Sequence, residues 1–149
     1  NIILNRHGGT INKLMGDAIM AYWGFPLREK NHALQAVRAA LAMKDALADL
    51  REEAGLEGLN IRIGINTGEA IIGNIGSEDF MDFTIIGDTV NTAARLEALN
   101  KEYDTRIMIS GDTWEQVKEA IDCRPLGGVQ VRGKEEETRI YEPLAPRDI

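Results

Sequence analysis

The sequence predicts an α+β fold in which helices pack on a largely antiparallel sheet. Three observations support this prediction. Residues 31–54 carry apolar side chains at three- and four-residue steps, which indicates a long amphipathic helix. Pairs of short strand-like runs lie on both sides of it, and helices and strands follow each other in a mixed order. The length of 149 residues, with 44% hydrophobic and 28% charged residues, fits one globular domain over residues 1–149.

The N-terminal region predicts the end of a helix followed by a hairpin. Residues 1–7 change from apolar to polar and are followed by two glycines, a pattern typical of a helix end. Residues 10–14 and 18–23 are strand-like on either side of Met15-Gly16-Asp17. A short turn with a glycine between two strands indicates a β-hairpin.

The long helix over residues 31–54 has boundaries that the sequence marks. Asn31 can cap its first turn, and Gly55 lies just past its end. The apolar stripe of this helix is expected to lie in the core and consists of Ala33, Ala36, Ala40, Met43, Leu47 and Leu50.

The middle of the chain predicts strands and a second helix. Residues 60–66 alternate in strand period, and residues 70–75 and 81–86 form further strand-like runs. A tight turn then leads into a helix over residues 89–103. Asp88 is expected to cap this helix, because its carboxylate can accept hydrogen bonds from the free N–H groups of the first turn. Small residues expected to let neighbouring segments approach closely are Gly73, Gly76, Ala93, Ala94 and Ala98.

The C-terminal part predicts a strand, a short helix and late strands. Residues 106–110 form the strand, and Ser110 or Asp112 can cap a short helix that reaches Ile121. The late strands are expected at residues 123–125, 129–132 and 139–143, followed by a loose tail at 144–149.

Composition argues against several kinds of partner and against a histidine metal cluster. The net charge of −7 argues against nucleic acid or an anionic membrane as a general partner. No apolar run approaches the ~20 residues that cross a bilayer, so no membrane contact is expected from this segment. Cys123 is the single cysteine; it fits a reducing, cytoplasmic compartment and is expected to be a buried apolar group. His7 and His32 are too isolated for a metal cluster and are expected at the surface.

Two segments pair residues that can carry chemistry. Asn91 and Arg95 lie four residues apart on the second helix, hence side by side on one face. A neutral amide and a cation one turn apart can hold a sugar and a phosphate together. Lys13 and Asp17 pair a cation with a carboxylate across the hairpin turn. Either pair alone can also be explained as ordinary solvent-facing residues. The presence of both segments in one chain is what points to a function.

Together, residues 13–21 and 84–95 resemble the catalytic domain of class III nucleotide cyclases, and the resemblance extends from Gly8 to Pro143. It implies a ferredoxin-like sheet. In that family a strand and a helix precede the region where this chain begins, so the chain would lack the first strand and most of the first helix. The first of the family's two metal-binding aspartates lies on that strand. We therefore expect the intact polypeptide to supply this aspartate, and the fragment alone to be inactive.

The resemblance also implies roles for individual residues. Asp17 matches the second metal-binding aspartate, in a site that holds two Mg²⁺ or Mn²⁺ ions. Asn91 and Arg95 match the transition-state pair, in which the amide orients the ribose and the guanidinium stabilises the α-phosphate. Lys134 matches the phosphate-binding lysine, although a lysine paired with the neighbouring glutamates is an alternative interpretation.

The base-selecting positions imply ATP as the substrate and cyclic AMP as the product. Lys13 matches the lysine of adenylyl cyclases, where guanylyl cyclases usually have glutamate. Thr84 occupies the second base-selecting position, where many adenylyl cyclases have aspartate. In having threonine there, the chain resembles a largely bacterial subgroup of adenylyl cyclases.

The family's active site lies between two domains, and all matching residues here lie on one chain. The resemblance therefore implies a homodimer with two sites, together with an upstream regulatory domain in the parent chain. Two alternatives stay open: a non-catalytic dimerisation or regulatory module, and a guanylyl cyclase.

Overall fold

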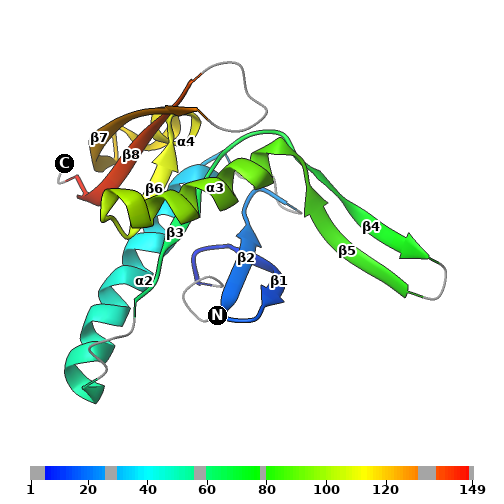
Figure 1. Cartoon of the computed structure of the whole chain (residues 1–149), viewed down its shortest axis with the longest axis horizontal. Coiled ribbons are helices and arrows are strands. Elements are labelled where there is room, and N and C mark those ends of the chain that lie inside the picture. The colour runs from blue at the N-terminus through cyan, green and yellow to red at the C-terminus, as the bar shows by residue number, and fades with distance from the viewer. Residues whose placement is uncertain (1–5, 26–29, 56–59, 78–79, 131–136, 148–149) are drawn as a thin grey trace.

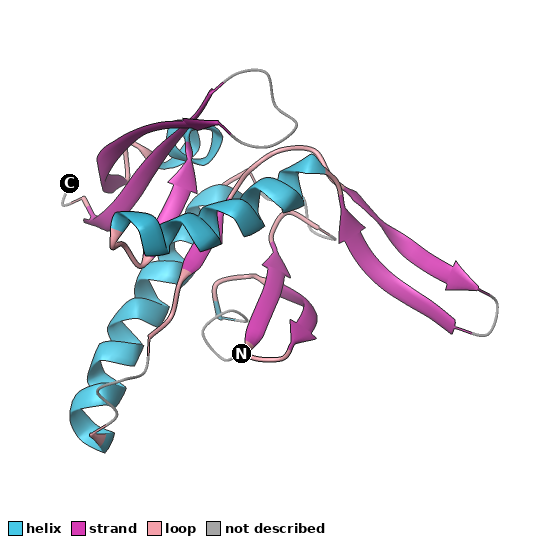
Figure 2. Ribbon diagram, viewed as in Figure 1, coloured by secondary structure: helices cyan, strands magenta, loops and turns pink. Residues whose placement is uncertain are grey.

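The computed structural model describes residues 6–25, 30–55, 60–77, 80–130 and 137–147. It confirms the predicted α+β class, and antiparallel pairing predominates among its strands. Figures 1 and 2 show the arrangement. The elements in chain order are β1 (Thr10–Met15), β2 (Ala18–Tyr22), α2 (His32–Ala54), β3 (Ile63–Ile65), β4 (Ile71–Ser77), β5 (Phe80–Ile86), α3 (Asp88–Tyr103), β6 (Ile107–Ser110), α4 (Gly111–Val117), β7 (Ile121–Gln130) and β8 (Glu137–Pro146).

The strands of the described residues are divided over three sheets. The largest has the order β3-β6-β8-β7, in which β3 and β6 are parallel and the other pairs antiparallel. Strands β1 and β2 form one separate hairpin, and β4 and β5 form another. Hairpin β4–β5 projects from the rest of the molecule in Figure 1.

The core lies on both faces of the four-stranded sheet. Neighbouring residues of β6 point to opposite faces, as the strand period requires. Ile107 and Ile109 pack with Val37 of α2 on one face, and Met108 packs with Leu96 of α3 on the other. All five side chains are at most 1% exposed. Helices α2 and α4 therefore cover one face of the sheet, and α3 covers the other.

Helix α2 follows the predicted stripe over its first half only. Ala33, Ala36 and Ala40 are buried, whereas Leu50 is 46% exposed. Figure 1 shows the reason, because the C-terminal turns of α2 extend beyond the sheet. The helix ends as predicted, at Gly55 in the left-handed conformation with φ 66°.

Two of the predicted helix caps differ from the structure. The N-cap of α3 is Gly87, at φ 137°, and Asp88 is the first helical residue without a side-chain cap bond. Its negative charge still lies in the first turn, where the helix dipole favours it. Asn31 occupies the N-cap of α2 but makes no side-chain cap bond. Ser110 caps α4 as predicted, and its hydroxyl oxygen accepts from the Thr113 N–H at 3.3 Å.

The C-terminal strands are longer than predicted. Helix α4 ends at Val117, and Ile121 is instead the fully buried first residue of β7. The two strands expected within 123–132 form one strand with two register shifts, between Asp122 and Cys123 and between Pro125 and Gly127. Pro125 is tolerated because β7 is an edge strand.

The prediction of a loose C-terminal tail is wrong for residues 144–147. Residues 144–146 belong to β8, and the Arg147 N–H donates to the carbonyl of Ala120 at 2.8 Å. An ion pair of 3.0 Å joins Arg147 to Asp122.

Candidate active site

The predicted pair on α3 lies on the solvent face of that helix. Asn91 and Arg95 are both exposed. The opposite face carries Thr92 and Leu96, which are at most 1% exposed, and Leu96 packs with Met108 of the four-stranded sheet. An amide and a guanidinium are therefore presented together from a helix whose other side is anchored in the core.

Helix α3 approaches β3 closely, but at only one of the three alanines that the sequence suggested, Ala93. Ala94 and Ala98 are exposed, on the solvent side of the helix. The close contact lies at Gly64 of β3, where a side chain would meet the main chain of Ala93 and Glu97. Gly73, expected to allow close approach, has open space beside it.

Two asparagines fasten α3 to β3, and the sequence did not single them out. Asn100 is 1% exposed, and its amide donates to the carbonyl of Ile63 at 2.9 Å. Asn66 lies one residue past β3, and its amide donates to the Thr89 carbonyl in the first turn of α3 at 3.1 Å. A signal for Asn66 was its position directly after the alternating strand, which local patterns also explain as the start of an ordinary turn.

The second predicted pair lies on hairpin β1–β2. Lys13 opposes Met20, and Asp17 follows Gly16, whose φ of 61° makes the turn. Both Lys13 and Asp17 are exposed. No hydrogen bond or ion pair between described residues joins this pair to Asn91 or Arg95. Lys13 and Asp17 thus lie on hairpin β1–β2, and Asn91 and Arg95 lie one turn apart on α3.

Two predicted substrate-binding residues can be placed only in part or not at all. The backbone of Thr84 lies in β5 opposite Gly73. Lys134 lies outside the described residues. Their roles stay predictions.

At the position where the sequence predicts a metal ligand, the structure presents one exposed carboxylate, that of Asp17. An exposed carboxylate such as that of Asp17 is the donor that Mg²⁺ prefers. Across the part of the chain that the structure describes, no group of three or more His, Cys, Asp or Glu side chains could hold a metal ion. Further carboxylate ligands would therefore have to come from elsewhere.

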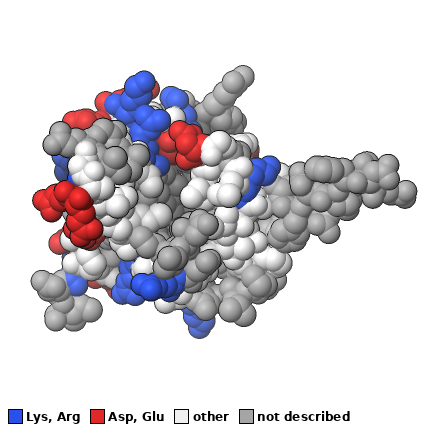
Figure 3. Space-filling model, turned by 90° about the horizontal axis from the view of Figure 1, so that it is seen from below, with Lys and Arg blue, Asp and Glu red and all other residues white. Residues whose placement is uncertain are grey.

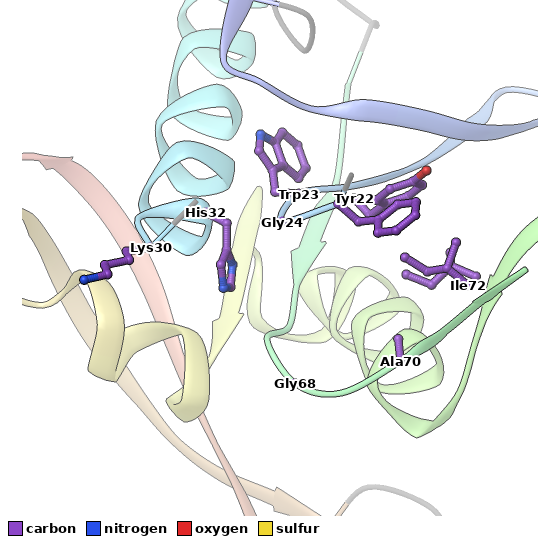
Figure 4. Close-up of a pocket in the computed structure, with 10 residues that line it drawn as sticks. Tyr22, Trp23, Gly24, Lys30, His32, Gly68, Ala70 and Ile72 are labelled. Atoms are coloured by element: carbon purple, nitrogen blue, oxygen red, sulfur yellow. The ribbon is translucent and has the colours of Figure 1, made fainter. Parts of the chain in front are cut away.

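A cavity of about 430 Å³ lies between the end of β2, the start of α2 and the segment before β4. Figure 4 shows its lining, which includes Tyr22, Trp23 and His32. The Trp23 indole N–H donates to the carbonyl of His7 at 2.9 Å. His7 and His32 are half-buried rather than at the surface. Among the predicted site residues whose side chains the structure describes, namely Lys13, Asp17, Asn91 and Arg95, none lines this cavity.

The charged side chains are of both signs on the face shown in Figure 3. In the described parts of the chain, no helix is both long and apolar enough to span a membrane.

Comparison with known proteins identifies the family. A family model described as the adenylate and guanylate cyclase catalytic domain matches residues 2–141. The chain therefore belongs to the adenylate and guanylate cyclase catalytic domain family.

Two curated relatives are named adenylate cyclases. Adenylate cyclase 1 of Rhizobium meliloti is 37% identical over 143 residues, which cover 94% of this chain and 22% of the relative. The terminal-differentiation specific adenylate cyclase of Dictyostelium discoideum is 43% identical over 143 residues, covering 92% of this chain and 7% of the relative. The chain thus spans about a fifth or less of the length of these two relatives.

Solved structures of similar fold include cyclases of both kinds. The adenylyl cyclase CyaB from P. aeruginosa has a TM-score of 0.85 and 34% identity, covering 98% of this chain and 76% of that one. The guanylyl cyclase Cya2 has a TM-score of 0.81 and 32% identity, covering 99% of this chain and 75% of that one.

Proposed function

We propose that this chain is the catalytic domain of an adenylyl cyclase, which converts ATP to 3′,5′-cyclic AMP and pyrophosphate. The observation that carries the proposal is the exposed pair of Asn91 and Arg95 on a helix anchored in the core. Family membership and the names of the relatives support it.

The proposed reaction needs positioning and charge stabilisation rather than a covalent intermediate. The ribose 3′ hydroxyl gives up its proton to water, its oxygen attacks the α-phosphorus, and the bond to pyrophosphate breaks. Asn91 orients the ribose through its amide. Arg95 donates parallel hydrogen bonds to the α-phosphate oxygens as negative charge builds there, a task that suits a guanidinium because it is always charged.

Asp17 holds Mg²⁺ or Mn²⁺ in this proposal. When bound there, such ions would neutralise part of the phosphate charge and favour loss of the proton from the attacking hydroxyl. The exposed position of Asp17 beside the hairpin turn leaves its carboxylate accessible to such an ion.

Lys13 and Thr84 select adenine, and Lys134 binds phosphate. The ammonium of Lys13 donates to an acceptor on the edge of the base, and the Thr84 hydroxyl accepts from the adenine amino group. Lys13 is exposed on β1, as a substrate-contacting residue must be.

The proposed working unit is a homodimer in which Asp17 of one subunit meets Asn91 and Arg95 of the other. The base-selecting residues Lys13 and Thr84 act from the same subunit as Asn91 and Arg95. The placement of Asp17 on hairpin β1–β2 and of Asn91 and Arg95 on α3 is compatible with this arrangement. Apolar cross-strand pairs on both hairpins also support it: Leu14 opposes Ile19 and Ile71 opposes Ile86, and these four side chains are 42–67% exposed. Exposed apolar pairs of this kind are common in protein–protein contacts. Because the curated relatives are much longer, we also propose that a regulatory segment lies elsewhere in the parent chain.

The test is an assay of the intact protein with Mn²⁺–ATP and, separately, Mn²⁺–GTP. We expect cyclic AMP from ATP and at least about tenfold less cyclic GMP from GTP, the discrimination that one charged hydrogen bond to the base provides. Preference for GTP would establish a guanylyl cyclase, in line with the similarity to Cya2. No product from either nucleotide would overturn the proposal in favour of a non-catalytic module.

A further inference from the structure

Asn66 uses both ends of its side-chain amide to join three elements. Its nitrogen donates to the Thr89 carbonyl in the first turn of α3 at 3.1 Å. Its oxygen accepts from the Ser110 hydroxyl at 2.6 Å. Ser110 is fully buried and also caps α4. Asn66 itself follows the last residue of β3, so one side chain ties β3, the N-terminus of α3 and the β6–α4 junction together.

The surrounding contacts hold the same turn of α3 in place. The Thr89 hydroxyl donates to the carbonyl of Glu69 at 2.5 Å. A Cβ on Gly68 would stand 2.7 Å from that hydroxyl oxygen, so the loop after β3 lies directly against Thr89. Thr67 in the same loop makes a hydroxyl–hydroxyl hydrogen bond of 2.8 Å with the buried Thr113 of α4.

The far end of α3 is fixed by an equivalent attachment. The Asn100 amide donates to the carbonyl of Ile63 at the start of β3, and its oxygen accepts from the Thr105 hydroxyl at 2.7 Å. Helix α3 is therefore attached to β3 at both ends. Asn66 is the attachment nearer the proposed site, because Thr89 precedes Asn91 by two residues.

We propose that Asn66 is a positioning residue that sets where α3 presents Asn91 and Arg95 to the reacting nucleotide. The inference rests on the proposed function of that pair. Asn66 itself does not touch substrate in this proposal; it acts through the first turn of α3. Asparagine suits the position because aspartate lacks the N–H donor that the Thr89 carbonyl requires.

The test replaces Asn66 by aspartate in the intact protein, which keeps the acceptor for Ser110 and sets a carboxylate against the Thr89 carbonyl. We expect kcat for cyclic AMP formation to fall at least about tenfold, with KM for ATP changed much less, since misplacement of reacting groups by about 1 Å is costly. Asn60→Asp is the matched control. Asn60 is exposed and its oxygen accepts from Arg51 and Arg106, so aspartate there keeps both contacts and should leave kcat unchanged.

A double variant separates positioning from loss of folded protein. If Asn66 acts through the α3 pair, Asn66→Asp should lower kcat little further when Arg95 is already alanine, because non-additivity marks groups that act as one unit. Equal fold losses in both backgrounds would overturn the inference and leave Asn66 a structural residue.

Hydrogen exchange gives a readout that does not require activity. The Val90 and Asn91 N–H groups donate to the Gly87 carbonyl, and their exchange should quicken in Asn66→Asp while that of the β6 core stays slow. Unchanged exchange at both amides would overturn the inference.

The two proposals fail differently. An active wild-type protein whose Asn66→Asp variant keeps full kcat refutes the positioning role alone. A wild-type protein that forms no cyclic nucleotide refutes the cyclase function on which that role rests.

Discussion

Gly64 of β3 lies directly against the main chain of α3, beneath Ala93. A Cβ added to Gly64 would stand 2.3 Å from the Ala93 carbonyl oxygen and 2.3 Å from the Glu97 amide nitrogen. Main chain therefore meets main chain at this crossing, and no L side chain fits between them without separating the two elements. The height of α3 above the sheet is set here.

Replacing Gly64 by alanine should destabilise the fold. The added methyl group must push α3 away from β3, and we expect the free energy of unfolding to fall by about 2–3 kcal/mol, as overpacked sites do. Urea unfolding monitored by circular dichroism measures this. Gly73→Ala is the control, because open space surrounds Gly73 and its substitution should cost little. Equal stability of the Gly64 and Gly73 variants would show that α3 can move without penalty.

Replacing Arg95 by alanine should abolish most of the proposed activity while leaving the fold intact. We expect kcat to fall on the order of 10²-fold or more, as happens when a donor to developing charge is removed. Arg95 is exposed, so the midpoint of thermal unfolding should hardly change. The control is Arg124→Ala, which removes a guanidinium paired with Glu142 at 2.7 Å on the β7–β8 ribbon. Unchanged turnover of Arg95→Ala at saturating ATP would exclude Arg95 from the mechanism.

Two inactive variants should restore activity when mixed, if each site is shared between subunits. A dimer of one Asp17→Ala subunit and one Arg95→Ala subunit has one intact site and one doubly damaged site. With free subunit exchange, half of the dimers are mixed, so about a quarter of wild-type activity is expected at a symmetric interface. The measurement is cyclic AMP formation after co-incubation at equal concentrations. If the mixture stays as inactive as its components, Asp17 and Arg95 do not meet across subunits.

The thiol of Cys123 should react slowly below pH 10 in the folded protein. Burial raises the pKa of this half-buried thiol from 9.0 to about 11. The thiolate is the reactive form, so alkylation should be about 100-fold slower than in the unfolded chain near pH 8. The rate should rise until about pH 11 in the native state, but level off near pH 9 in urea.

The same shift has a consequence for stability. Between pH 9 and 11 the unfolded chain releases the Cys123 proton while the folded chain keeps it, so folding stability falls as pH rises through this window. Cys123→Ser gives the background for both measurements, because Cys123 is the single cysteine. A native alkylation rate that levels off near pH 9 would contradict the burial of this thiol.

The predictions that depended on local pattern were largely confirmed. The three- and four-residue spacing placed α2, and the glycine-bearing turn placed hairpin β1–β2. The predictions were wrong where tertiary contacts determine the secondary structure. Ile121 fits a helix by spacing, but it is buried in the core as the first residue of β7. The expected tail pairs with the start of β7, a partner more than 20 residues distant in sequence.

The placement of Asn91 and Arg95 on one helix face was predictable from the sequence, but the contacts that support this helix were not. Asn91 and Arg95 share a face because of their spacing, and the structure places both on the exposed side of α3. The residues that fix this helix could not be inferred, since Gly64, Asn66 and Asn100 act through partners between 23 and 37 positions away. A short-range pattern carries no information on such pairs. The chemical roles of Lys13, Asp17, Thr84 and Lys134 stay predictions.

The division into three sheets separates a packed block, formed by the helices and the four-stranded sheet, from the two hairpins. Both hydrophobic clusters belong to the helices and the four-stranded sheet, and no described residue of hairpins β1–β2 or β4–β5 is a member of either. Local opening of a hairpin therefore costs far less than unfolding that block. Asp17 lies on hairpin β1–β2, and Arg95 lies on α3 of the packed block. Closing the proposed site would therefore order a hairpin of one subunit against the packed block of the other.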